Sequence, residues 1–157
     1  LRASAAADDV GVKVLKIESD VKENSTIYFS SIIKNYGSET QSAIDVRATI
    51  FDSEGNEMWN DNQQIIGPLE SGEEETLEWQ WESNNPGEFT IIVETTKEDE
   101  NHRNNDKEID FGVEMIHLPE ISTINHDKEG EPGAKLEFNI VIKNSASGTD
   151  TLSLIHI

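Results

Sequence analysis

Apolar residues alternate with polar ones in six separate segments of this chain, and this period of two constrains the fold more than any other feature. A β-strand points successive side chains to opposite faces, so each segment predicts a strand with one buried face and one wet face. No stretch repeats its apolar residues at the helical period of 3.6. The alternating segments are Val10–Ile17, Ile27–Lys34, Ile44–Ile50, Leu77–Glu82, Phe89–Val93 and Ile109–Val113. A seventh, looser segment runs from Met58 to Ile66.

Turn-forming residues separate these segments. Asp52–Asn56 predicts a hairpin turn in which Gly55 takes a positive φ, and Asn84–Gly87 predicts another turn. Strands about ten residues apart are typical of an antiparallel sandwich. We therefore expect an all-β chain with an immunoglobulin-like antiparallel β-sandwich of about seven strands over residues 8–116.

The alternation also predicts which side chains lie inside. Val10, Val12 and Val14 are expected on one face of the first strand, with Ile17 slipped by one residue. Trp79 and Trp81 lie two apart between polar residues, and this spacing predicts that both belong to the core.

One strand ending occurs twice. Ile33–Asn35 recurs as Ile142–Asn144, an offset of about 109 residues, which is a domain length for this fold. The short amide of each Asn is expected to hydrogen-bond the local backbone and to tolerate left-handed geometry. The repeat predicts tandem domains, with a linker at residues 117–120 and a truncated second immunoglobulin-like unit at 121–157.

The two ends predict a fragment of a longer protein. Residues 1–7 are rich in alanine and fit either a linker or the remnant of a signal peptide. The last residues, Ser153–Ile157, fit either a native strand or a peptide translated from sequencing-adapter read-through.

The charge balance excludes several classes of function. Twelve basic and 32 acidic residues give a net charge of −20, which repels nucleic acids and anionic membranes and favours cations and basic partners. The chain has no Cys, so disulfides and thiolate metal sites are excluded. Its four His residues follow no metal-ligand or catalytic spacing. We expect no nucleic acid partner, no membrane insertion and no enzymatic activity.

Three weak candidate sites remain. The loop before the seventh strand carries hard oxygen donors that could bind Ca²⁺, although the sequence favours a solvated hairpin in which Asn residues cap the turns. Trp59 lies among polar residues and is the best candidate for stacking on a glycan. Asn24 begins the glycosylation sequon Asn24–Thr26, in a predicted turn. The calcium candidates are Asp99, Glu100, Asn104, Asn105 and Asp106.

Six short motifs follow one another in a recognisable order: Asp9–Val12, Ile33–Gly37, Leu69–Gly72, Leu77–Trp81, Pro86–Phe89 and Asn104–Asn105. Their order and spacing resemble CARDB, the cell-adhesion-related domain family of bacterial and archaeal surface proteins. The resemblance implies an immunoglobulin-like module used for surface display, adhesion or spacing, without catalysis. Thr95 and Thr96 replace the Asp usual in the family, which weakens any ligand set carried over from it.

Together these features predict a non-catalytic, extracellular or cell-surface spacer or adhesion unit within a tandem-repeat protein. Its expected partners are other immunoglobulin-like repeats of the same chain and a protein or glycan at a surface. The alternative is an accessory module of a secreted protease or glycosidase that binds glycan or calcium. The spacer or adhesion unit predicts further repeats and a surface anchor in the parent gene, whereas the accessory module predicts a catalytic domain.

Overall fold

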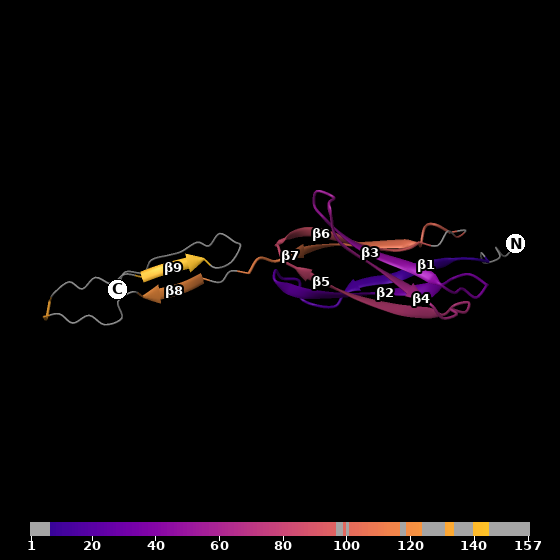
Figure 1. Ribbon diagram of the computed structural model, residues 1–157, viewed down its shortest axis with the longest axis horizontal. Helices are drawn as coiled ribbons and strands as arrows, with labels where there is room; N and C mark the ends of the chain where they lie inside the picture. Colours follow the sequence, from indigo (N-terminus) through magenta and orange to yellow (C-terminus); the bar gives the residue numbers. More distant parts are fainter. Residues whose placement is uncertain are drawn as a thin grey trace. The chain divides into compact units, whose positions relative to one another are not determined.

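The computed structural model describes residues 7–96, 99, 101–116, 119–123, 131–133 and 140–144, and all its regular elements are strands. The chain divides into a first unit that ends at Glu114 and a second that begins at Met115 (Figure 1). The strands of the first unit are β1 (Val10–Ile17), β2 (Ser25–Asn35), β3 (Ile44–Asp52), β4 (Glu57–Ile65), β5 (Glu74–Ser83), β6 (Gly87–Thr95) and β7 (Asp106–Val113).

The first unit is a sandwich of two antiparallel sheets. One sheet has the strand order β1-β2-β5 and the other has the order β4-β3-β6-β7. Successive strands β4 and β5 lie in different sheets, each at an edge. This arrangement confirms the immunoglobulin-like β-sandwich of seven strands that the sequence predicts.

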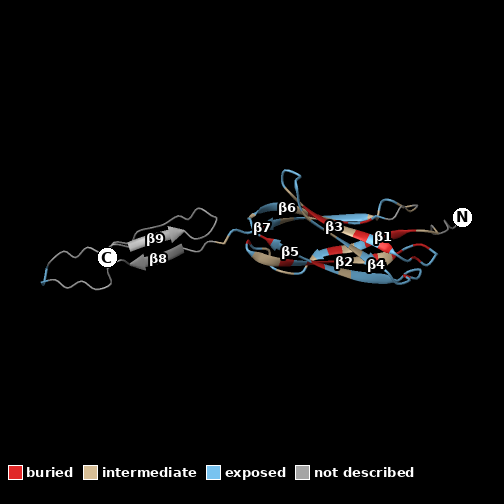
Figure 2. Cartoon of the chain, viewed as in Figure 1, coloured by how far each residue is buried: buried red, intermediate tan, exposed pale blue. Residues whose placement is uncertain are grey.

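The core lies between the two sheets, where Figure 2 shows buried residues alternating with exposed ones along the strands. Phe29 stacks on Trp79 with ring centroids 5.7 Å apart. Trp81 meets Phe89 edge-on at 5.1 Å. Trp79 and Trp81 are only 5% and 8% exposed, which confirms their predicted place in the core.

Strand β1 departs from the predicted alternation. Val12 pairs with Ile33 and the next ladder pair joins Val14 to Ile32, so Lys13 is an extra residue in a β-bulge. The bulge turns Val14 out of the core and brings Leu15 into it, where Leu15 is 9% exposed. The expectation that Val14 shares a face with Val12 is therefore wrong, because the slip falls at Lys13 and not at Ile17.

The repeated Asn ends β2 as a buried hub of backbone hydrogen bonds. The side-chain amide of Asn35, which is 0% exposed, donates to the carbonyls of Glu39 at 2.8 Å and Leu69 at 2.9 Å. Its Oδ1 accepts from the N–H of Gly37 at 2.9 Å. The predicted backbone bonding is confirmed, but left-handed geometry occurs elsewhere among the described non-glycine residues, at Asn24 and Ala43.

Other predictions about turns and ends have different outcomes. Gly55 has a φ of +83°, which confirms the predicted hairpin geometry at Asp52–Asn56. Asp52 closes this turn by accepting hydrogen bonds from the N–H groups of Glu54 and Asn56. Residues 1–6, the linker residues 117 and 118, and the segment Ser153–Ile157 lie outside the described residues.

The second unit contains β8 (Pro119–Thr123) and β9 (Ile140–Asn144), which pair antiparallel. Pro119 faces Asn144 and Ile121 faces Ile142. These pairs lie 109 residues beyond Val10 with Asn35 and Val12 with Ile33, the pairs of β1 and β2. The two hairpins therefore share their register over three successive pairs, up to the point where the bulge interrupts β1.

Candidate functional site

The β6–β7 loop is tied to the beginning of β1 by two aspartates, forming the Asp9–Asp99 cluster (Asp9, Asp99, Asn101 and Asn104). Asp99 accepts hydrogen bonds from the N–H of Val10 at 2.9 Å and from the N–H of Asn101 at 3.0 Å. Asp9 accepts from the side-chain amides of Asn104 at 2.7 Å and Asn101 at 3.3 Å. Each carboxylate therefore joins segments about 90 residues apart in the sequence.

Gly11 allows the loop to approach the backbone of β1. The carbonyl of Asn104 accepts a hydrogen bond of 2.7 Å from the N–H of Val12. A Cβ at position 11 would lie 2.6 Å from the side-chain carbon Cγ of Asn104 and 2.7 Å from its carbonyl oxygen. A glycine inside a strand often marks such an approach, and this one permits the cluster.

The structure brings together only part of the predicted calcium set. Asp99 and Asn104 lie in the cluster, whereas Asp106 begins β7 and pairs with Glu94. Asn105 contacts the cluster, because its side-chain amide donates to Asp99 at 3.4 Å, and its carbonyl accepts from the N–H of Thr95 at 2.8 Å. Glu100 lies outside the described residues.

The cluster also contains Asn101, another oxygen donor of the same loop, and Asp9, which the sequence analysis did not place at this site. The spacing of the sequence carries no signal for Asp9, because it meets the loop only after folding. Within the described ranges, no three His, Cys, Asp or Glu side chains group around a common metal position. Oδ1 of Asn104 is buried and has no hydrogen-bond partner.

Trp59 lies on β4 and is half-buried. Its ring meets Phe29 edge-on, with centroids 5.7 Å apart and planes at 87°. Only part of the indole is thus open to a ligand, and glycan stacking at Trp59 stays a prediction.

Asn24 is exposed in the turn before β2, with a φ of +54°. Its N–H donates to the carbonyl of Ser83 at 2.5 Å, while its side chain lies at the surface. The position agrees with an accessible sequon, and its use stays a prediction.

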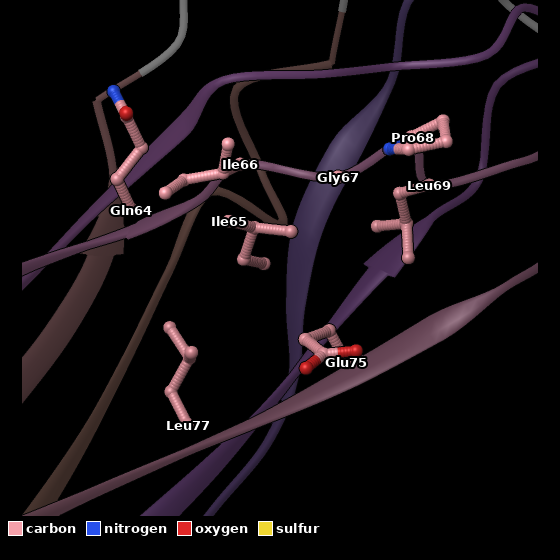
Figure 3. A pocket seen from close by; sticks show the side chains of 8 residues that line it. All are labelled: Gln64, Ile65, Ile66, Gly67, Pro68, Leu69, Glu75 and Leu77. Atoms are coloured by element: carbon pink, nitrogen blue, oxygen red, sulfur yellow. The ribbon is translucent and has the colours of Figure 1, made fainter.

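A groove opens where β4 leads into β5 (Figure 3). It has a volume of about 290 Å³ and is lined by the end of β4, by the connection that follows, and by β5. Its lining is Gln64, Ile65, Ile66, Gly67, Pro68, Leu69, Glu75 and Leu77. Ile65 and Leu69 are buried below it, whereas Ile66 is 80% exposed at its rim.

Glu74, next to the groove, forms ion pairs with two lysines. Lys13 and Lys34 both donate to its carboxylate, at 2.8 Å and 3.0 Å. The hydrogen bond from Lys13, followed by that from Lys34, lowers the pKa of Glu74. Among the described side chains, both lysines pair with this one carboxylate.

Comparison with known proteins decides the family. The family model CARDB matches residues 7–108, more than half of the chain. The chain belongs to the CARDB family. CARDB domains are non-catalytic immunoglobulin-like modules that occur in surface proteins, so residues 7–108 form a non-catalytic module.

Solved structures agree with this family. The CARDB domain of a Pyrococcus furiosus protein, determined in complex with di-metal ions, is 23% identical, with a TM-score of 0.57; the match covers 71% of this chain and 97% of that one. A domain assigned to the cell surface of Methanosarcina acetivorans is 19% identical, with a TM-score of 0.53, covering 68% and 91%. These likenesses show the fold. The described part of the chain has no helix with the length and apolarity to span a membrane.

Proposed function

We propose that this CARDB domain is an extracellular spacer and adhesion unit within a tandem array of immunoglobulin-like modules. The observation that carries the proposal is the shared register of the β1–β2 and β8–β9 hairpins at one offset of 109 residues. Asn35 pairs with Val10, the first residue of β1, and Asn144 pairs with Pro119, the first residue of β8. Unrelated hairpins are not expected to share this pairing.

The surface chemistry supports the same role. A net charge of −20 keeps neighbouring modules apart and soluble. The Asp9–Asp99 cluster fastens the loop at one end of the sandwich to β1, so a partner meets a firmly held end. A module of this kind works by holding surfaces in place and needs no reactive group.

Location and gene context test this proposal. Antibodies raised against residues 7–114 are expected to label intact source cells, and the parent gene is expected to encode further units of this kind with a surface anchor. Labelling that requires cell lysis would refute the extracellular assignment. A catalytic domain beside a single module would favour the accessory role.

Calcium binding at the Asp9–Asp99 cluster is a second candidate function. Asp9, Asp99 and Asn104 carry the hard oxygen donors that Ca²⁺ prefers, and Oδ1 of Asn104 is a buried acceptor without a partner. A similar CARDB domain was determined with di-metal ions. These two observations make the cluster a better candidate than the loop residues alone.

A thermal melt tests the calcium proposal. Extracellular calcium modules have Kd values near 1 mM, so 10 mM Ca²⁺ would add about 1.4 kcal/mol to the free energy of unfolding. For a domain of this size that raises Tm by about 5 °C. NaCl at equal ionic strength is the control for screening of the acidic surface. An equal shift in Asp99→Asn would refute binding at the cluster.

A further inference from the structure

The groove between the β4–β5 connection and β5 combines an apolar wall with one carboxylate. Leu77 and Glu75 come from β5, while Ile65, Ile66 and Leu69 come from the opposite side, and Figure 3 shows these side chains around one space. About 290 Å³ is at the lower limit of small-molecule sites and fits one or two inserted side chains.

Glu75 is an unusual residue for its position. It alternates with Leu77 and Trp79 on the face of β5 that is turned toward the other sheet, yet it stays exposed because β5 is an edge strand. None of the ion pairs among the described side chains includes Glu75, since the nearby lysines bind Glu74 on the other face.

The edges of both sheets face this groove. β5 and β4 each end their sheet's strand order, so in the described part of the chain each has one row of backbone N–H and C=O groups without a neighbouring strand. Gln63 joins the two edges at one point, where its amide donates to the carbonyl of Glu78 at 2.9 Å. An extended segment can hydrogen-bond to such an edge beyond this point, as in β-strand addition.

Charge decides between the occupants that could fill the groove. A net charge of −20 disfavours a second copy of this chain and attracts basic segments. Lys and Arg carry a long aliphatic stem and a charged end, which match the apolar wall and the free carboxylate. We propose that the groove docks an extended basic segment of a partner protein, with a Lys or Arg stem along Ile66 and Leu77 and its charged end at Glu75.

A different role for Glu75 makes an opposite prediction. Charged residues that point inward from an edge strand protect sheets against edge-to-edge aggregation. If that were the whole role of Glu75, its neutralisation would increase self-association and leave peptide binding unchanged. The proposal concerns this one surface and stands whether or not the module belongs to a repeat array.

Peptide titration of the full 157-residue chain tests the proposal. The probe is a labelled hexapeptide that alternates Lys with Thr. Its binding is measured by fluorescence anisotropy at pH 7. A comparison peptide replaces Lys by 2,4-diaminobutyric acid, which keeps the charge but shortens the stem. The variants are Glu75→Gln, Ile66→Ser and, as a control with the same change of charge, Glu82→Gln. All three residues are exposed, so the fold is kept.

Glu75→Gln is expected to raise the Kd of the Lys peptide about threefold to tenfold, and Ile66→Ser about threefold. Glu82→Gln should change it by less than about 1.5-fold. Equal losses in Glu75→Gln and Glu82→Gln would overturn the proposal, since binding would follow total charge alone. Equal affinity for both peptides would overturn it as well. So would self-association of Glu75→Gln with unchanged peptide binding.

Discussion

Replacement of Asn35 by Ala tests the structural role of the repeated Asn most directly. The side chain is fully buried and makes three hydrogen bonds to the backbone of two loops. The bond to Glu39 contributes least, because that residue is exposed and water can replace the amide. The two buried bonds, to Leu69 and Gly37, each contribute about 1–1.5 kcal/mol.

The expected loss in the free energy of unfolding for Asn35→Ala is therefore about 2–3 kcal/mol. This corresponds to a fall in Tm of about 10 °C for a domain of this size. Larger losses are not expected, because the carbonyl of Leu69 also accepts from the N–H of Gln41, and the N–H of Gly37 also donates to the carbonyl of Asp9.

Urea denaturation followed by tryptophan fluorescence measures this loss. All three Trp residues lie on β4 and β5, so the signal reports on the first unit alone. Asn62→Ala is the matched control, since Asn62 is exposed on β4, and its effect should stay within about 0.5 kcal/mol. An Asn35→Ala variant as stable as this control would refute the hydrogen-bond argument.

Three further outcomes are expected. Gly11→Ala should lose about 1–3 kcal/mol in urea melts and speed proteolysis of the β6–β7 loop, because the new Cβ would collide with Asn104. Two lysines lower the pKa of Glu74, so its stabilising effect, present above the ordinary carboxyl pKa, is lost as the pH falls through the lowered pKa. Glu74→Gln should therefore lose less of its free energy of unfolding than the unchanged chain when the pH of the urea melts is taken below 4.5. Deletion of Lys13 should keep the β1–β2 ladder, because Lys13 has no partner in it. Deletion of Lys16 shifts the residues next to it out of register and should lower the free energy of unfolding more.

The strands could be predicted from sequence because the pleat imposes its period of two on every half-buried strand. Ile44, Val46, Ala48 and Ile50 alternate without interruption, and all four are 0% exposed. The same reasoning placed Trp79 and Trp81 in the core, since their neighbours on both sides are polar. Alternation thus predicts the inward face well wherever the ladder has no irregularity.

The candidate site could not be predicted in the same way, because it depends on contacts between distant segments. Asp9 and Asn104 are 95 residues apart and meet only when the β6–β7 loop packs against β1. One local signal did exist at Gly11, since a glycine inside a strand marks close approach of another backbone. That signal gives the place of the contact but not the identity of its partner.

The bulge at Lys13 explains how β1 contacts both sheets of the sandwich. Before the bulge, Val12 pairs with β2 and also donates its N–H to the carbonyl of Asn104 in the β6–β7 loop. The N–H of Val10 donates to Asp99 of the same loop. After the bulge, Leu15 returns to the core opposite Ser31. If Lys13 were part of a regular strand, Leu15 would turn to solvent, because the side-chain period is two. In the second unit the β8–β9 ladder continues from Ile121 to Thr123 without a bulge, so the shared register ends where β1 is adapted to contact the second sheet.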